Sequence, residues 1–251
     1  MKVYFIGAGP GDPELLTVKA RRLLETCKIL VYAGSLVSDT VVALAPADAE
    51  RHNSATMSLN EIVEVFVSAR ERGLDVARLH SGDPSIYGAI GEQMRTLDGL
   101  GIEYEVIPGV SSFQAAAAAL KKELTAPEVS QTIILTRMAG RTPVPEEQDL
   151  AVLGKSRATL CVFLSVSKIS EVAEKLTDSY GADAPVSVVS RASWPDQRIV
   201  RGTLYDIAGK VSEAGIEKTA MIIVGRALDD GAEAVSRLYD ESFSHEYRKA
   251  R

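Results

Sequence analysis

Residues 3–24 read VYFIGAGPGDPELLTVKARRLL: an apolar run, a glycine-rich turn and an amphipathic stretch follow one another. The apolar run at residues 3–7 predicts a β-strand. A helix is expected over residues 13–25, because Asp12 is a favourable N-cap and Pro13 suits the first helical position. Strand, glycine turn and helix in this order are the repeating unit of an α/β fold.

The same alternation of apolar runs and amphipathic stretches continues through the first half of the chain. Further strands are expected over residues 29–33, 76–80 and 104–107, and helices over residues 59–72, 86–97 and 112–120. Connections of this length suit helical crossovers between parallel strands. The first half is therefore predicted to be an α/β domain whose mostly parallel sheet is covered on both faces.

A polar stretch, KKELTAPEVS at residues 121–130, is interpreted as an interdomain linker, and a second series of elements follows it. Strands are expected over residues 132–136, 158–164, 186–190, 199–202 and 221–224, and helices near residues 146–153, 168–180 and 204–214. Only a short polar segment joins the strands at residues 186–190 and 199–202. These two strands are therefore predicted to be antiparallel, which makes the second sheet mixed.

The expected organisation is two α/β domains, at residues 1–120 and 131–228, followed by a charged C-terminal tail at residues 229–251. Leu238, Tyr239 and Phe243 are the apolar residues expected to dock this tail. The sequence shows no internal repeat of fixed period and no low-complexity tract.

The composition is ordinary for a soluble globular protein and argues against two classes of partner. The 251 residues include 28 Lys and Arg against 34 Asp and Glu, a net charge of −6, whereas broad nucleic-acid binding needs a basic face. No apolar run approaches the ~20 residues of a membrane span, and the N-terminus lacks the features of a signal peptide. We expect a cytoplasmic protein. Cys27 and Cys161 each lie in an apolar run outside any Cys-x-x-Cys motif, which predicts buried thiols and no metal site.

Three glycine-bearing turns follow predicted strands: GAGPGD at residues 7–12, SGDP at residues 81–84 and PGVSS at residues 108–112. In open parallel sheets, ligands usually bind beyond the carboxyl ends of the strands. The repetition favours a ligand wrapped by backbone, because glycine lets a ligand approach the main chain closely. Two structural interpretations stay open, a tight turn for the first motif and a simple helix N-cap for Asp83. His80, next to the second turn, is interpreted as a structural histidine.

The first turn does not match the dinucleotide fingerprint Gly-x-Gly-x-x-Gly. Asp12 stands where the fingerprint has its third glycine, and Pro10 lacks the amide that a phosphate cradle would use. A carboxylate at the start of the helix also disfavours pyrophosphate there. A nicotinamide oxidoreductase is therefore kept only as a weaker alternative.

Arginines are concentrated on the predicted strand-end loops of the second half. Arg137 and Arg141 lie in the segment RMAGRTP, and Arg191 and Arg198 flank the segment SWPD. Each arginine alone is compatible with a solvated surface cation, but together they favour a ligand that carries several carboxylates. Trp194 is expected to pack either against an interface or against a flat ligand.

Several motifs together resemble a known family: GAGPGDPELLTVKA, YAGSLV, LHSGDPSIYGAI, PGVSSFQAAAAAL, ELTAPEVSQTIILTRMAGRTPVPE, SWPDQRIVRGT and TAMIIVG. They resemble the tetrapyrrole (corrin/porphyrin) methyltransferase superfamily over about residues 1–228. The GAGPGDPELLT and SGDP blocks are shared across the superfamily, whereas YAGSLV, EVSQTIILTR and GRTPVPE resemble the branch that methylates C11 of precorrin-4. One departure is Gln197, where an acidic residue is expected after SWPD.

The resemblance implies two α/β domains with S-adenosylmethionine bound in a cleft between them, and a homodimer. The implied reaction is the C-methylation of precorrin-4 at C11 to precorrin-5 in cobalamin biosynthesis, with S-adenosylhomocysteine as the second product. Methylation at another position of the macrocycle, or of uroporphyrinogen III, is the main alternative, and a non-catalytic tetrapyrrole carrier is another. The sequence leaves open whether the substrate ring already holds cobalt.

The resemblance also implies which residues form the site. Contacts with S-adenosylmethionine are expected from Pro10, Gly82, Asp83, Ile86, Ser111, Ser112, Leu164, Ala192, Thr219 and Ala220. The substrate carboxylates are expected to bind Arg137, Arg141 and Arg191. No residue is predicted as a general base, and none as a metal ligand.

Overall fold

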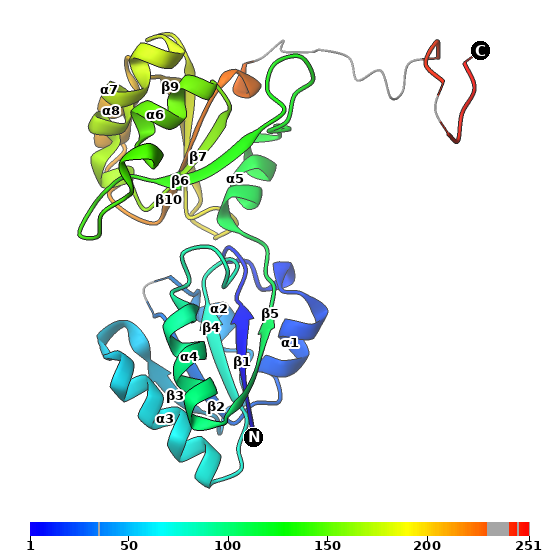
Figure 1. Ribbon diagram of the computed structural model, residues 1–251, viewed down its shortest axis with the longest axis vertical. Coiled ribbons are helices and arrows are strands. Elements are labelled where there is room, and N and C mark those ends of the chain that lie inside the picture. The colour runs from blue at the N-terminus through cyan, green and yellow to red at the C-terminus, as the bar shows by residue number, and fades with distance from the viewer. Residues whose placement is uncertain (35, 230–240, 245, 251) are drawn as a thin grey trace. The chain divides into compact units, whose positions relative to one another are not determined.

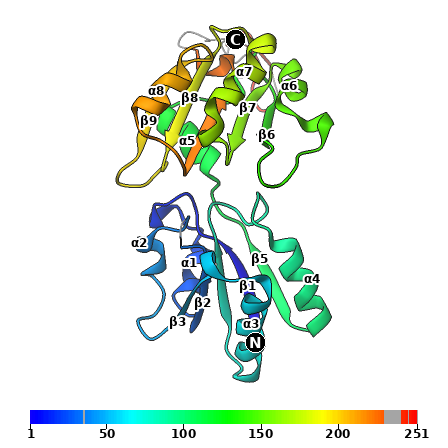
Figure 2. The same ribbon diagram turned by 90° about the vertical axis from the view of Figure 1, so that its left-hand side faces the viewer.

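The structure of the chain, a computed structural model, describes residues 1–34, 36–229, 241–244 and 246–250. The chain divides into two compact units, Met1–Ala116 with Arg191–Gln197, and Ala117–Ser190 with Arg198–Arg251. Each unit is built around its own five-stranded sheet (Figure 1, Figure 2).

The sheet of the first unit, predicted to be mostly parallel, is parallel at each of its strand pairs, and its strand order is β3-β2-β4-β1-β5. Its strands are β1 (Lys2–Gly7), β2 (Ile29–Tyr32), β3 (Glu50–Asn53), β4 (Val76–His80) and β5 (Glu103–Ile107). Its helical elements are η1 (Pro13–Leu15), α1 (Val18–Leu24), α2 (Asp39–Val42), η2 (Ser54–Thr56), α3 (Leu59–Glu71) and α4 (Ile90–Leu100), where η marks a 3-10 turn. The division between the units falls inside α5 (Ser112–Leu120).

Alternate residues of β1 enter two separate cores, one on each face of this sheet. Ile6 shares a core with Leu24 of α1, whereas Phe5 shares the other core with Phe66 of α3 and Leu97 of α4. Successive side chains of a strand point to opposite faces, so a strand covered on both sides is apolar along its whole length. The predicted coverage of both faces is confirmed.

The sheet of the second unit is mixed, as predicted, with strand order β6-β7-β10-β8-β9. Its strands are β6 (Ile133–Arg137), β7 (Thr159–Phe163), β8 (Pro185–Ser190), β9 (Arg198–Thr203) and β10 (Ala220–Val224). Its helical elements are η3 (Glu146–Gln148), α6 (Leu150–Leu153), η4 (Gly154–Ser156), η5 (Val166–Lys168), α7 (Ile169–Tyr180), α8 (Ile207–Glu213) and η6 (Arg226–Leu228). The pair β8–β9 is antiparallel, as its short connection predicts, and Leu150, Leu176 and Ile207 of the three α-helices share one core with β7, β8 and β10.

Two predicted helices are interrupted by a residue that caps a new helix. Residues 13–25 form η1 and then α1, because Thr17 is extended and its side chain accepts a hydrogen bond from the Ala20 amide. Residues 146–153 likewise divide into η3 and α6 at Asp149, which caps α6. Both capping residues restart the helix where the hydrophobic period alone predicts continuity.

The helix predicted over residues 86–97 is wrong at its start. Tyr87 and Ala89 have φ angles of +55° and +49°, and α4 begins only at Ile90. Left-handed backbone cannot belong to a right-handed α-helix, and non-glycine residues adopt it at a cost. Contacts made by other parts of the unit must therefore override the local helical preference here.

Three short elements of the first unit, α2, β3 and the 3-10 turn η2, have no counterpart among the predicted ones. The helix α2 is four residues long, and β3 has the polar sequence ERHN. A polar strand at the edge of a sheet lacks the apolar alternation by which strands are recognised in a sequence.

Some expectations reach beyond the described residues. Leu238 and Tyr239, expected to dock the tail, lie outside the described part of the chain, whereas Phe243 is described and is 40% exposed. The domain limits expected at residues 120 and 131 stay a prediction. Within the described ranges, every helix is too short or too polar to traverse a lipid bilayer.

Candidate functional site

The three glycine turns of the first unit lie side by side. They are the β1 turn (residues 8–12), the β4 turn (residues 81–84) and the β5 turn (residues 108–112). Each follows the carboxyl end of its strand, and β4, β1 and β5 are consecutive in the parallel sheet (Figure 1). Carboxyl ends of parallel strands share one edge, so the chain brings together the turns that the sequence singles out.

Main-chain hydrogen bonds join the β1 turn to the β4 turn. The Ala8 amide donates to the His80 carbonyl at 2.8 Å, and Gly9 and Gly82 exchange two hydrogen bonds of 3.2 and 2.8 Å. Gly82 has a φ of +65°, a conformation that side-chain-bearing residues rarely adopt. The shape of the turn therefore favours glycine at position 82.

At two other glycines, the space that a side chain would need is filled by protein backbone. A Cβ on Gly109 would lie 2.2 Å from the Gly82 carbonyl oxygen, and a Cβ on Gly7 would lie 2.6 Å from the Gly109 Cα. These glycines serve the close packing of one turn on the next. At Gly7 and Gly109, glycine is thus explained by the packing of the turns rather than by access for a ligand.

Asp83 ties the β4 turn to the β5 turn. One carboxylate oxygen accepts hydrogen bonds from the Ser85 amide, at 2.8 Å, and from the Ser85 hydroxyl. The other oxygen accepts from the Gly109 amide at 2.9 Å. Partial burial raises the pKa of Asp83, but these hydrogen bonds outweigh burial and hold the pKa below its usual value. Asp83 is therefore ionised at neutral pH, and it is more than a helix cap because it joins two turns.

A strained segment follows the β4 turn, and we call residues 85–89 the hook. Tyr87 and Ala89 are left-handed, at a cost of about 1–3 kcal/mol each. Gly88 between them packs so closely that a Cβ there would lie 2.1 Å from the Pro84 carbonyl oxygen. The predicted cofactor residue Ile86 is half-buried within this hook. Strain of this kind is concentrated at functional sites in proteins.

Residues 191–197 belong to the first unit and pack against the β1 turn. The Trp194 indole donates to the Pro10 carbonyl at 2.7 Å, and the Asp12 amide donates to the Ser193 hydroxyl at 3.0 Å. A Cβ on Gly11 would lie 2.2 Å from the indole ring. Of the two predicted environments of Trp194, the structure shows packing against protein, and Pro10 is buried beneath it.

The departure from the family pattern at Gln197 preserves a hydrogen bond. The Gln197 side-chain oxygen accepts from the Ser193 amide at 2.8 Å, and Ser193 is itself left-handed, with a φ of +69°. A carboxylate oxygen of an acidic residue would accept the same hydrogen bond. Glutamine therefore supports the loop in the same way without adding a negative charge.

The predicted site residues of the second half come to one edge of the second sheet. The strand β6 ends at Arg137 and β7 ends at Phe163, and these two residues are register partners. The strand β10 begins at Ala220, the register partner of Ser190 at the end of β8. Leu164, directly after β7, lies at this same edge because β10 is antiparallel to β7.

Two of these residues have strained backbone. Leu164 and Thr219 both have a φ of +53°, although a β-branched residue such as threonine rarely adopts this conformation. Leu164 is also 68% exposed despite its large apolar side chain. Strain and exposure at one position do not stabilise the fold, so both features are compatible with the binding role predicted for Leu164.

The three arginines expected to bind substrate differ in their present contacts. Arg137 donates hydrogen bonds of 2.8–3.2 Å to three carbonyl groups of its own loop, residues 138–143. Arg191 pairs with Asp196 at 2.9 Å, and its guanidinium lies 4.1 Å from the centre of the Trp194 ring. Arg141 is exposed. Arg137 therefore shapes its loop, and Arg141 is the most exposed of the three. The binding of substrate by these arginines stays a prediction.

His80 is buried beside the β4 turn, as expected for a structural histidine. Its side chain is 6% exposed, and its ring centroid lies 5.9 Å from that of Phe5. Burial, and then the positive charge of Arg78, lowers the pKa of His80 to about 3. The imidazole is therefore neutral at physiological pH, and its Nε2 atom has no hydrogen-bond partner among the described residues.

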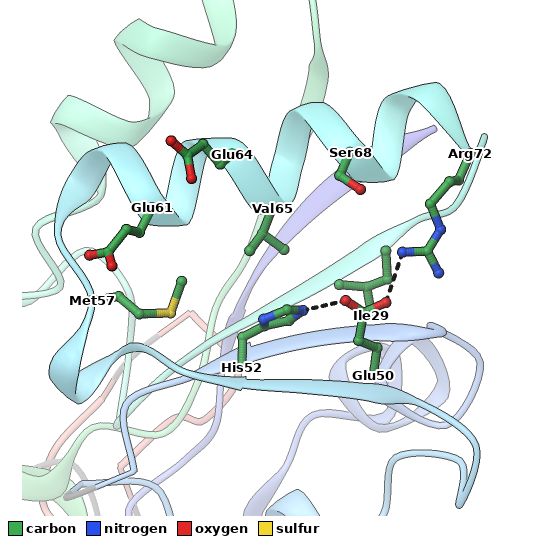
Figure 3. A pocket seen from close by; sticks show the side chains of 9 residues that line it. All are labelled: Ile29, Glu50, His52, Met57, Glu61, Glu64, Val65, Ser68 and Arg72. Carbon is green, nitrogen blue, oxygen red and sulfur yellow. Dashed lines mark hydrogen bonds and ion pairs between the residues drawn. The ribbon is translucent and has the colours of Figure 1, made fainter.

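A pocket of about 310 Å³ lies between α3 and the strands β2 and β3 (Figure 3). Three of its polar groups bind one another, because Glu50 pairs with both His52 and Arg72 at 2.8 Å. None of its lining residues belongs to the three turns or the hook. In the described parts of the chain, no group of three or more His, Cys, Asp and Glu side chains is placed to hold a metal ion.

The charge of the three turns favours a cationic ligand over a polyphosphate. Asp12 and Asp83 are the ionisable residues of residues 8–12, 81–84 and 108–112, which contain no lysine or arginine. A dinucleotide would place its pyrophosphate close to these carboxylates, whereas a sulfonium or ammonium group would be attracted to them. The edge of the first sheet is therefore suited to a positively charged, non-phosphorylated ligand.

The sequence matches the family described as Tetrapyrrole (Corrin/Porphyrin) Methylases over residues 2–208. It is 53% identical over 250 residues to the cobalt-precorrin-4 C(11)-methyltransferase of Methanocaldococcus jannaschii, a match that covers 99% of this chain and 96% of that protein. It is also 53% identical over 248 residues to the precorrin-4 C(11)-methyltransferase of Pseudomonas aeruginosa, with 99% of both chains covered.

Solved structures of related methyltransferases are also similar to this chain. The X-ray structure of a cobalamin biosynthetic enzyme, cobalt precorrin-4 methyltransferase, has a TM-score of 0.89 and 46% identity, covering 91% of this chain and 96% of that one. The uroporphyrin-III C-methyltransferase of Thermus thermophilus complexed with S-adenosylhomocysteine has a TM-score of 0.74 and 31% identity, covering 91% of this chain and 93% of that one.

Proposed function

The chain belongs to the tetrapyrrole (corrin/porphyrin) methylases, and from this premise we propose that it transfers a methyl group from S-adenosylmethionine to C11 of precorrin-4 in cobalamin biosynthesis. The observation that carries this proposal is the similarity, at 53% identity and over 99% of the chain, to C(11)-methyltransferases from two organisms. The geometry of the turns supports the choice of methyl donor.

The described residues fit S-adenosylmethionine in charge and in shape. Asp12 and the ionised Asp83 suit its ammonium and sulfonium cations, and the exposed apolar Leu164 offers a contact for its adenine. We propose contacts from Pro10, Gly82, Asp83, Ile86, Ser111, Ser112 and Ala192 of the first unit, and from Leu164, Thr219 and Ala220 of the second. Strained backbone at Leu164 and Thr219, and in the hook next to Ile86, supports this set.

The residues of the chain are required to bind, orient and exclude water rather than to supply a nucleophile. S-adenosylmethionine, when bound, supplies a methyl group that is already activated as a sulfonium. Holding an electron-rich ring carbon in line with the S–CH₃ bond lowers a barrier by about 7–11 kcal/mol in favourable cases. Asp83 is held by three hydrogen bonds, which suits a fixed binding group better than a base that must gain and lose a proton.

The test of this function is the position of the new methyl group. The purified chain is incubated with precorrin-4 and methyl-labelled S-adenosylmethionine, and the product is analysed by mass spectrometry and by NMR of the labelled methyl. We expect one added methyl at C11, with S-adenosylhomocysteine released. A methyl at another ring carbon would replace the C11 assignment, and pigment binding without transfer would indicate a carrier. Parallel reactions with cobalt-free and cobalt-containing precorrin-4 show which form is used.

We further propose that the chain works as a cytoplasmic homodimer. The support for both features is the family resemblance. Light scattering coupled to size-exclusion chromatography tests the dimer, because the expected mass is twice the 26.9 kDa of one chain.

A further inference from the structure

Arg78 is a buried cation in the middle of the first sheet. Its side chain is 6% exposed, and it lies on β4 beside Phe5, on the face that α3 and α4 cover. Its hydrogen bonds run to the Gln93 side-chain oxygen at 3.1 Å, the Ser54 hydroxyl at 3.0 Å and the Leu79 carbonyl at 3.5 Å. Within the described residues, Arg78 has no carboxylate partner. Buried charges are usually paired, so the groups that Arg78 does contact indicate what it is for.

Gln93 of α4 uses both ends of its side-chain amide. The oxygen accepts from the Arg78 Nε, and the nitrogen donates to the Ala89 carbonyl at 3.3 Å. A guanidinium has only donors, so the oxygen of the amide must face Arg78, and the NH₂ group is thereby directed at Ala89. A carboxylate at this position would accept from Arg78 equally well, but it could not donate to a carbonyl.

Ala89 is the last residue of the strained hook and the N-cap of α4. It has no side chain that could cap the helix, and its φ is +49°. One residue earlier, the Gly88 backbone faces the buried His80 ring, a contact that favours the protonated imidazole. Arg78 of β4 therefore holds the end of the hook through Gln93, and the buried His80 lies against the residue before it.

The hook needs such support because its own sequence favours another structure. The hydrophobic pattern predicts a helix from residue 86, yet the helix begins at Ile90, and Tyr87 and Ala89 before it are left-handed. Without support, residues 86–89 would gain stability by joining α4 as an additional right-handed turn. That change would move Ile86 and separate the hook from the β4 turn.

We propose that Arg78 is a positioning residue which, through the Gln93 amide, holds the hook in the left-handed conformation that S-adenosylmethionine binding requires. This inference rests on the proposed function, because it takes Ile86 and the β4 turn as parts of the donor site. Arg78 itself does not touch the donor in this scheme. It fixes the direction of the Gln93 amide, and the amide holds Ala89.

The decisive variant is Gln93→Glu, which keeps an acceptor for Arg78 and removes the donor to Ala89. Its matched control is Gln131→Glu, because Gln131 also donates to a backbone carbonyl, that of Thr125 at 3.3 Å, but is exposed and lies in the second unit. Binding of S-adenosylhomocysteine is measured by calorimetry, and the stability of each variant by urea unfolding.

We expect Gln93→Glu to weaken S-adenosylhomocysteine binding by about tenfold, the effect of one lost hydrogen bond, and Gln131→Glu to leave it unchanged. The urea midpoint of Gln93→Glu should not fall, because the new carboxylate pairs with Arg78. Arg78→Met should weaken binding to a similar extent, and combining it with Gln93→Glu should add little, since both act through one amide.

A rescue variant separates positioning from general loss of structure. Glycine adopts a φ of +49° without strain, so Ala89→Gly added to Gln93→Glu should restore most of the lost affinity. Unchanged affinity in Gln93→Glu and Arg78→Met, or loss of affinity that Ala89→Gly does not restore, would overturn the inference. Failure of the unaltered chain to bind S-adenosylhomocysteine would instead count against the proposed function.

Discussion

The indole Nε1 of Trp194 donates a hydrogen bond of 2.7 Å to the carbonyl of Pro10, 184 positions earlier in the chain. The neighbouring Ser193 hydroxyl accepts from the Asp12 amide, so two residues of one loop bind the same glycine-rich turn. The β1 turn therefore depends for its shape on residues 191–197 as well as on its own sequence. Substitutions at this contact should therefore lower the stability of the first unit.

Gly11→Ala should destabilise the first unit. The added Cβ would lie 2.2 Å from the indole of Trp194, at a residue with a φ of +156°, and overpacking of this kind costs about 1–3 kcal/mol. Urea unfolding followed by the fluorescence of Trp194, the single tryptophan, measures the loss. The control is Gly99→Ala in α4, where a Cβ meets nothing within 4 Å, and where alanine should stabilise by about 0.5–1 kcal/mol. Equal stability of Gly11→Ala and the unaltered chain would show that the loop can move away.

Gly109→Ala should be more damaging than Gly82→Ala, although both glycines lie in the turns. At Gly109 a Cβ would lie 2.2 Å from the Gly82 carbonyl oxygen, which is held in the main-chain bridge to Gly9. At Gly82 the nearest atom is 3.5 Å away, so alanine meets only the cost of a φ of +65°, about 1–2 kcal/mol. Thermal unfolding of both variants gives the order, and a larger loss in Gly82→Ala would contradict the packing described for these turns.

Asp83→Asn should lower the free energy of unfolding at neutral pH, and the difference from the unaltered chain should disappear in acid. The folded pKa of Asp83 lies below 3.8, its ordinary value, so the ionised carboxylate stabilises the fold above pH 3.8. That stabilisation disappears as the pH falls through the folded pKa. The amide keeps one acceptor, and the loss at pH 7 should be about 1–2 kcal/mol. Urea unfolding of both proteins at pH 7 and at decreasing acidic pH checks the prediction, which fails if the difference between them does not shrink.

His80 should also make the free energy of unfolding depend on pH, over a higher pH range than Asp83 does. Its folded pKa of about 3 lies below the ordinary 6.5, so the unfolded chain binds a proton that the folded chain does not. Stability should therefore fall as the pH drops from 6.5 towards 3, by up to about 1.4 kcal/mol per pH unit. His80→Asn should flatten this part of the curve. NMR titration provides the direct check, since an imidazole signal of His80 that titrates near pH 6.5 would exclude a buried neutral ring.

Much of the fold could be predicted because burial leaves a direct signature in the sequence. Strands β1 and β2, covered on both faces, are nearly continuous apolar runs, and the short connection between β8 and β9 allows only an antiparallel pair. The three glycine turns could be placed at one edge because parallel strands align their carboxyl ends. The polar edge strand β3 could not be predicted, because its side chains are mostly exposed and its sequence lacks the alternation of apolar and polar residues.

The candidate site could be predicted only in part, because its remaining contacts join residues that are distant in sequence or contradict local preference. Trp194 reaches Pro10 across most of the chain, which no local pattern reports. The sequence of the hook predicts the start of a helix, and the hydrogen bonds of the buried residues Arg78 and Gln93 override that local preference. The one local sign of this pair is an arginine between the apolar residues Ala77 and Leu79 of the strand VARLH.

Arg141→Ala should weaken binding of the tetrapyrrole without affecting the methyl donor. Arg141 is exposed on a strand-end loop, and a charged hydrogen bond to a carboxylate is worth about 1.5–3 kcal/mol. We expect the KM for precorrin-4 to rise by at least about tenfold, with kcat, the affinity for S-adenosylhomocysteine and the thermal midpoint unchanged.

The comparison variant is Arg137→Ala, which removes three hydrogen bonds to loop carbonyls and should lower the thermal midpoint as well as raise the KM. Arg141→Lys should recover part of the affinity, because it restores the charge without the planar fork. If Arg141→Ala weakens both ligands equally, the arginine shapes the protein rather than the substrate site.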